Sequence, residues 1–68
     1  MKKMEILIDE EGNRVVFERK QADSKGTFWL CHTYNFTFDV KAGDNPHTEM
    51  LYQLAKDGIY PRGAYRWA

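Results

Sequence analysis

The sequence predicts an α+β domain, in which one helix packs on an antiparallel meander of three strands, or four if the tail adds one. Apolar and polar side chains alternate through Thr27–Val40, a pattern typical of a strand with one buried face. Two shorter segments nearer the N-terminus also have strand-like patterns, with a glycine-containing turn between them. Further along, an apolar stripe with helical spacing is formed by Met50, Leu51, Leu54 and Ala55. The expected order of elements is therefore β-β-β-α, with an optional final strand.

The first two strands are expected at Met4–Asp9 and Arg14–Lys20. Glu10–Asn13 separates them, and Gly12 suits a tight turn because glycine tolerates positive φ. The first strand places its apolar side chains at Met4, Ile6 and Ile8, whereas the second has contiguous apolar residues and does not indicate which face is buried. Gln21–Gly26 is polar and is expected to form a loop.

The segment Thr27–Val40 places most of its large apolar side chains at even positions, which we expect to face the core. Fourteen extended residues would span roughly 46 Å, which is long for a compact domain of this size. The segment must therefore bend, bulge or turn back as a hairpin, and the polar cluster Cys31–Asn35 is the weakest point. We favour a bent strand, because the alternation keeps its phase throughout.

The helix is expected to begin after Asp44 or Asn45, either of which can cap it, with Pro46 at its first position. Gly58 is expected to end the helix in a left-handed conformation, followed by a hydrophobic contact from Ile59. The predicted core consists of Ile6, Ile8, Phe17, Phe28, Leu30, Tyr34, Phe36, Phe38, Met50, Leu51, Leu54 and Ile59.

Length and composition indicate a single domain over residues 1–68. Ten basic and ten acidic residues balance to zero net charge, so the strongest general argument for nucleic-acid binding is missing. The only cysteine, Cys31, cannot form an intrachain disulfide, and the N-terminal residues do not resemble a secretory signal. These features lead us to expect a cytoplasmic protein without a membrane partner.

No residue pattern predicts catalysis, a metal site or a cofactor. Cys31 and His32 are adjacent, so on a strand they point to opposite faces and cannot form a nucleophile–base pair. His47 is an alternative base for Cys31, but no recognisable motif surrounds it. A metal site from His32, His47, Asp39 and Asp44 would lack any characteristic spacing. We therefore expect a protein that is not an enzyme.

The tail is the strongest candidate for a binding surface, because aromatic and arginine side chains are interleaved in it. Tyrosine, tryptophan and arginine are enriched in protein interfaces, and the same residues can bind single-stranded nucleic acid. Trp29 is the one large side chain on the otherwise polar odd face of Thr27–Val40, where a partner or the folded-back Tyr65 or Trp67 would cover it. The candidate partner-binding residues are Trp29, Tyr60, Arg62, Tyr65, Arg66 and Trp67.

From these features we expect a non-catalytic protein-interaction module, acting as a homodimer or as the binder of a larger protein partner. The alternative is a module that binds single-stranded nucleic acid with the aromatic and basic side chains. The short length alone suggests a phage or mobile-element protein.

Overall fold

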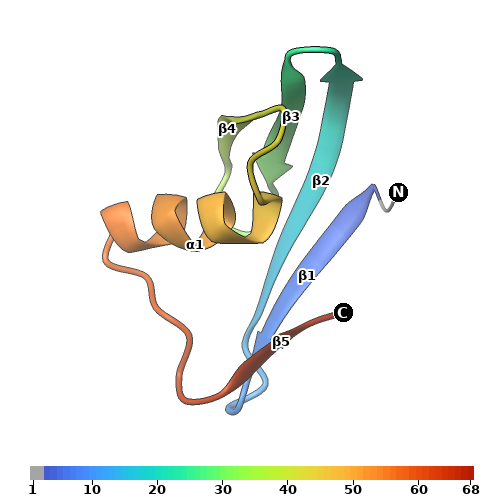
Figure 1. Ribbon diagram of the computed structural model, residues 1–68. Coiled ribbons are helices and arrows are strands. Elements are labelled where there is room, and N and C mark those ends of the chain that lie inside the picture. Colours follow the sequence, from blue (N-terminus) through green and yellow to red (C-terminus); the bar gives the residue numbers. More distant parts are fainter. Residues whose placement is uncertain (1–2) are drawn as a thin grey trace.

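The computed structural model describes residues 3–68 and shows one five-stranded antiparallel sheet and one helix (Figure 1). The strands are β1 (Met4–Asp9), β2 (Arg14–Asp23), β3 (Gly26–Cys31), β4 (Phe36–Lys41) and β5 (Tyr65–Trp67), and the helix is α1 (Pro46–Lys56). The sheet order is β4-β3-β2-β1-β5, so the chain after α1 crosses to the far edge of the sheet and adds β5 beside β1. The predicted α+β class, with an antiparallel meander and a single helix, is confirmed.

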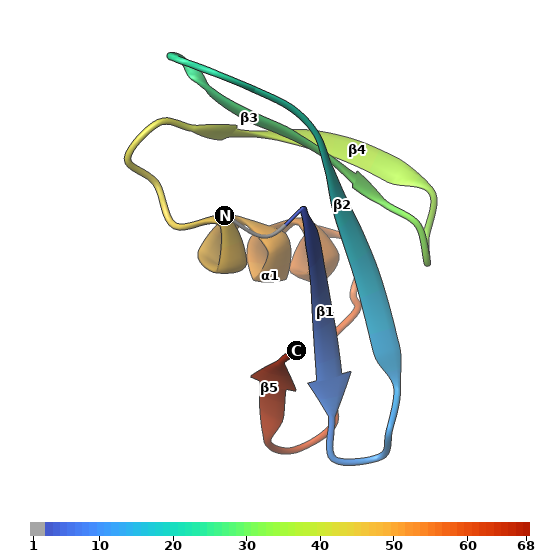
Figure 2. The same cartoon turned by 90° about the vertical axis from the view of Figure 1, so that its right-hand side faces the viewer.

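The sheet curls around the helix instead of lying flat beneath it. Figure 2 shows β3 and β4 arching over one side of α1, while β1 and β5 lie on the other side and β2 connects the two parts. The inner face of the curled sheet is therefore covered by α1, and the outer face carries no helix. Among residues 3–68 no helix is long and apolar enough to cross a membrane.

The segment Thr27–Val40 forms a hairpin, so the prediction of one bent strand is wrong. β3 and β4 pair in register, with Trp29 opposite Phe38 and Cys31 opposite Phe36. The turn contains Asn35, whose φ of 56° is left-handed, a conformation that asparagine tolerates better than most residues. A straight strand of that length would also exceed the 36 Å longest dimension of the molecule.

The hairpin changes which side chains face the helix. The inward-facing residues are Trp29 and Cys31 in β3 but Phe38 and Val40 in β4, all of them buried. The helix therefore does not pack on a single even-numbered face, as the alternation predicted. Trp29 is only 2% exposed, which contradicts its predicted place on an outward-facing, polar surface.

The second strand is longer than expected, because β2 and β3 continue the hairpin through the segment predicted as a loop. The pairing shifts by one residue between Arg19 and Gln21, which is the signature of a β-bulge. Only the tip of the predicted loop is a turn. There the Asp23 carboxylate accepts hydrogen bonds from the backbone N–H groups of Lys25 and Gly26.

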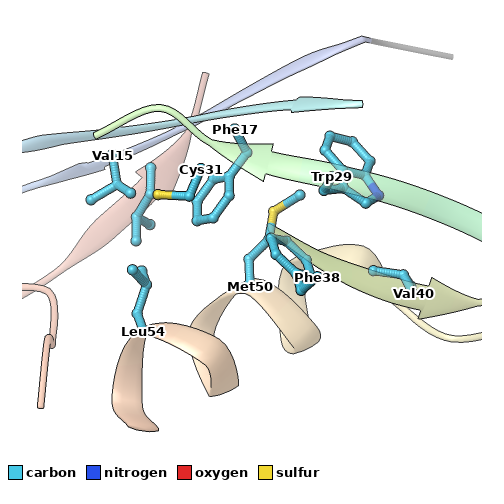
Figure 3. Packing of buried hydrophobic residues seen from close by; sticks show 9 residues of the cluster. Val15, Phe17, Trp29, Cys31, Phe38, Val40, Met50 and Leu54 are labelled. Carbon is cyan, nitrogen blue, oxygen red and sulfur yellow. The ribbon is translucent and has the colours of Figure 1, made fainter. Parts of the chain in front are cut away.

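The core lies between the inner face of the sheet and one side of α1 (Figure 3). Met50 and Leu54 of the helix point at Phe17 and Cys31 of the sheet, and all four are 0–1% exposed. The buried cluster consists of Leu7, Val15, Phe17, Trp29, Cys31, Phe38, Val40, Met50 and Leu54, with Phe36, Leu51, Ile59 and Trp67 packed against it.

Five residues of the predicted core lie elsewhere. Tyr34 is in the β3–β4 turn and is 46% exposed. The other four lie on the outer face, where Ile8 is buried outside the core cluster and Ile6, Phe28 and Leu30 are half-buried. On β1 the inner face instead carries Glu5, Leu7 and Asp9, as the pairing of Leu7 with Val15 and of Glu5 with Phe17 shows.

Both ends of the helix follow the prediction. The Asn45 side chain accepts a hydrogen bond from the His47 backbone N–H at 2.9 Å, and Pro46 is the first helical residue. At the other end Gly58 has a φ of 74°. The Ile59 N–H donates to the Leu54 carbonyl oxygen at 3.0 Å, which completes the expected left-handed cap with its hydrophobic contact.

We expect Trp29 to be inaccessible to solvent in the native protein, because the core encloses its indole ring. The chain has two tryptophans, so the Trp67→Phe protein reports on Trp29 alone. Iodide should quench its fluorescence weakly in the folded state and strongly after unfolding in urea. Strong iodide quenching of the folded variant, with native circular dichroism, would place Trp29 on the surface and contradict the observed hairpin register.

Candidate functional site

A groove of about 660 Å³ opens at the end of the molecule where the β1–β2 and β3–β4 turns meet the tail. Four segments form it: the β1–β2 end, the β3–β4 turn, the C-terminal end of α1 and the chain that follows. The lining residues are Leu7, Asp9, Asn13, Arg14, Val15, Thr33, Tyr34, Leu54, Gly58, Ile59, Tyr60, Pro61 and Arg62. We call this surface the tyrosine groove. Its volume lies within the range of ligand-binding clefts.

The tyrosine groove combines an apolar floor with an aromatic and basic rim. Leu7, Leu54 and the half-buried Ile59 belong to the floor, which continues the hydrophobic core. Tyr34 and Tyr60 belong to the rim and are 46% and 66% exposed. A surface of this composition resembles the centre of a protein interface, where aromatic residues and arginine are enriched.

Asp9 holds the wall of the groove together. Its carboxylate accepts hydrogen bonds from the backbone N–H groups of Glu11 and Asn13, from the Asn13 side-chain amide and from the Arg62 backbone N–H, each at 3.0 Å. The Glu10 backbone N–H donates to the Arg62 carbonyl oxygen at 3.2 Å. The side chain therefore closes the β1–β2 turn and ties the tail to it.

These contacts keep Asp9 ionised although it is 8% exposed. The Arg62 N–H donates to the charged form and, as the largest cause, lowers the pKa of the Asp9 carboxyl below its ordinary value. Burial acts in the opposite direction, and the donors from Asn13 and Glu11 lower the pKa further. The carboxylate is thus a structural anchor whose acceptor positions are already in use.

The structure separates the tail residues that the sequence grouped together. Tyr60 and Arg62 line the tyrosine groove. Tyr65 pairs with Asp9 in the β1–β5 ladder at the same end of the molecule. Arg66 pairs with Ile8 and shares the outer face with Arg14, which pairs with Ile8 from the other side.

The two tryptophans lie on the inner face, and the alternative prediction that the tail packs on Trp29 is not what the structure shows. The Trp29 indole N–H donates to the Thr27 hydroxyl at 2.7 Å. Trp67 instead stacks on His47, with ring centroids 4.0 Å apart and planes 3° apart, and tilts against Phe17. His47 Nε2 also lies 2.5 Å from a carboxylate oxygen of Glu5. These contacts fasten β5 and the start of α1 to β1.

Cys31 and His32 point to opposite sides of the sheet, as predicted for neighbours on a strand. Cys31 is enclosed in the core, and burial raises the pKa of its thiol. His32 is on the outer face, where its Nε2 is 2.8 Å from the Glu18 carboxylate, and this hydrogen bond is the main reason that the pKa of Glu18 is lowered. Within residues 3–68, no three side chains from histidine, cysteine, aspartate or glutamate gather as metal ligands would.

Asp9, Arg14 and Tyr34 are among the groove residues that the sequence did not single out as site residues. The spacing of Asp9 and Asn13 around Gly12 is a usable signal, because aspartate side chains commonly accept hydrogen bonds within a turn. Tyr34 would be expected at an exposed tip once a turn is placed at His32–Asn35. No local signal shows that Arg14 and Arg62 line the same groove, because this depends on the return of the tail.

A second hollow, of about 370 Å³, lies at the tip of the β2–β3 hairpin. Phe28 is its only aromatic residue and is half-buried, while aspartates and lysines line much of the remainder. It therefore offers less exposed aromatic surface than the tyrosine groove.

Comparisons with protein-family models, with curated proteins and with solved structures found no match to this chain. The functional argument that follows is based on the geometry and chemistry of the tyrosine groove.

We expect Asp9→Asn to lower the midpoint of thermal unfolding at neutral pH, because the amide would turn an N–H donor toward other donors. The pKa of Asp9 is lower in the folded state than its ordinary value. The Asp9 carboxylate therefore adds fully to the free energy of unfolding above that ordinary pKa, and this stabilisation is lost as the pH falls through the folded-state pKa. Between about pH 7 and about pH 2.5, Asp9→Asn should therefore lose less stability than the unmodified protein.

Calorimetric unfolding across this pH range provides the measurement, and Glu11→Gln is the matched control in the same turn. The prediction fails if the two variants behave alike. Equal midpoints at neutral pH and an equal loss of stability in acid would show that the Asp9 side-chain contacts do not stabilise the fold.

Proposed function

We propose that this protein is a non-catalytic interaction module that binds a partner protein through the tyrosine groove. The observation that supports the proposal is the pair of exposed tyrosines, Tyr34 and Tyr60, on the rim of a groove with an apolar floor. Self-association and binding to a larger protein were both expected from the sequence, and we favour the larger partner because a groove accepts a protruding segment.

Tyrosine side chains suit this role for a physical reason. Each offers a large amphipathic surface but has only two rotatable side-chain bonds, so little conformational entropy is lost when a partner immobilises it. Together with the groove arginines they provide the residue types that most often dominate binding energy. Leu7 and Leu54 beneath them are already held by the core, so the floor is formed before binding and costs little to organise.

The chemistry of the lining favours binding over catalysis. The groove residues include one carboxylate, Asp9, and neither histidine nor cysteine. Asp9 accepts four hydrogen bonds, and the Thr33 hydroxyl accepts one from the Val16 backbone N–H at 2.9 Å. Neither group is paired with a base that would activate it, as nucleophilic or acid–base catalysis requires.

Single-stranded nucleic-acid binding, the alternative function, has less support from the positions of its residues than it had from the sequence. It relied on Trp29, Tyr65, Trp67, Arg62 and Arg66. The Trp29 ring is inside the core, and one face of Trp67 is covered by His47, so the two best stacking platforms are occupied.

A cytoplasmic location remains a prediction from the single cysteine.

Site-specific photo-cross-linking in the host cell tests the proposal. A photoreactive phenylalanine analogue at position 60 should form a discrete covalent product with one protein, whereas the same analogue at position 52 should not. Tyr52 is a matched control because it is 58% exposed on α1 and lies outside the groove lining.

The captured protein should then bind the purified chain, and Tyr60→Ala should weaken the affinity roughly tenfold or more, while Tyr52→Ala leaves it unchanged. Identical products at positions 52 and 60, or none at position 60, would overturn the proposal. A product of two copies of this chain would assign the groove to self-association and overturn the larger-partner form.

A further inference from the structure

We infer that the tyrosine groove recognises a short peptide segment in which an apolar side chain lies next to a carboxylate. This inference rests on the proposed function and adds the chemical class of the partner segment. Three features carry it: the apolar floor, the exposed Arg62 side chain, which has no carboxylate partner among residues 3–68, and a groove carboxylate whose acceptor positions are already used by hydrogen-bond donors.

The arginines provide the first part of the argument. Arg14 and Arg62 both line the groove and are exposed. Among residues 3–68, the ion pairs of the structure do not involve either guanidinium group. A guanidinium group presents paired N–H donors that match a carboxylate. Arg14 begins β2 on the outer face, opposite Ile8, so Arg62 is the anion-binding side chain that the groove offers to a ligand.

The second part is that the hydrogen-bonding capacity of the groove carboxylate is already used. Among residues 3–68, Asp9 is the only carboxylate of the lining, and its oxygens accept hydrogen bonds from Glu11, Asn13 and Arg62. The neighbouring acid Glu10 packs against Gly63, just beyond the lining residues. A ligand carboxylate would therefore meet N–H and O–H donors, including the tyrosine hydroxyl groups of the rim.

The floor supplies the third part. Ile59 is half-buried and lies beside the fully packed Leu54, so an apolar side chain of a ligand would continue the core at this point. The Ile59 and Arg62 positions are held by the helix cap and by Asp9, respectively. The apolar and anionic subsites are thus built on one tethered segment of tail, which places both parts of a ligand within a few residues of each other.

Backbone amide signals of the ¹⁵N-labelled chain of residues 1–68 can test this with three blocked pentapeptides. The sequences are Gly-Asp-Leu-Asp-Gly, Gly-Lys-Leu-Lys-Gly and Gly-Asp-Gly-Asp-Gly. At about 1 mM ligand, a concentration suited to weak binding, only the first should shift the signals of Ile59, Arg62 and Tyr34.

Arg62→Gln should weaken binding of the aspartate–leucine peptide roughly tenfold, because it removes a charge-assisted hydrogen bond. Arg66→Gln is the matched control, since Arg66 is an exposed tail arginine on the outer face, and it should leave the affinity unchanged.

Equal shifts with the lysine peptide would overturn the anionic subsite, and equal shifts with the peptide that lacks leucine would overturn the apolar one. If none of the peptides shifts the groove signals while the cross-link at position 60 persists, the inference fails and the proposed function stands. If the cross-link is absent and the aspartate–leucine peptide still binds, the groove chemistry is right and the protein partner is wrong.

Discussion

The structure depends on one helix filling the inside of a curled sheet. Phe17 is at the centre of that contact and is fully buried. Its ring meets the Phe38 ring edge-on, with centroids 5.8 Å apart, and its centroid lies 6.2 Å from that of the Trp67 ring. Met50 and Leu54 close over it from the helix. A chain of 68 residues buries a modest share of its surface, so strands from both edges of the sheet must contribute to this single cluster.

The return of the tail follows from the same constraint. β5 brings Trp67 onto the inner face, where the His47 ring stacks on it, and Asp9 holds the preceding segment at Arg62. The inner face of β1 carries two carboxylates, and each is hydrogen-bonded. Glu5 pairs with His47, and Asp9 accepts from backbone N–H groups. Because these side chains are satisfied, the inner face of β1 tolerates them beside the core. The tyrosine groove forms where this tethered tail leaves the helix.

Local sequence patterns predicted the turns and helix ends well, but predicted poorly which side chains of each strand face the core. The first strand, the β1–β2 turn and both helix ends have the expected bounds, because Gly12, Asn45, Pro46 and Gly58 act through their own backbone conformation or that of near neighbours. The inward face changes between Cys31 and Phe38 because the hairpin turn interrupts the alternation, and the bulge after Arg19 shifts β2 in the same way. Alternation alone does not reveal a turn or a bulge where polar residues stand at both odd and even positions.

The sequence by itself determined the α+β class and the single helix with its caps, and it predicted Tyr60 and Arg62 as binding residues. Only the tertiary structure decided that Trp29 belongs to the core, that Trp67 is stacked on His47, and that Tyr34 and Arg14 join the tail around one groove. The reason is the range of the interactions. Caps and turns are formed by residues within a few positions of each other, whereas the groove brings together the first strand, the middle hairpin and the tail through contacts such as that of Asp9 with Arg62.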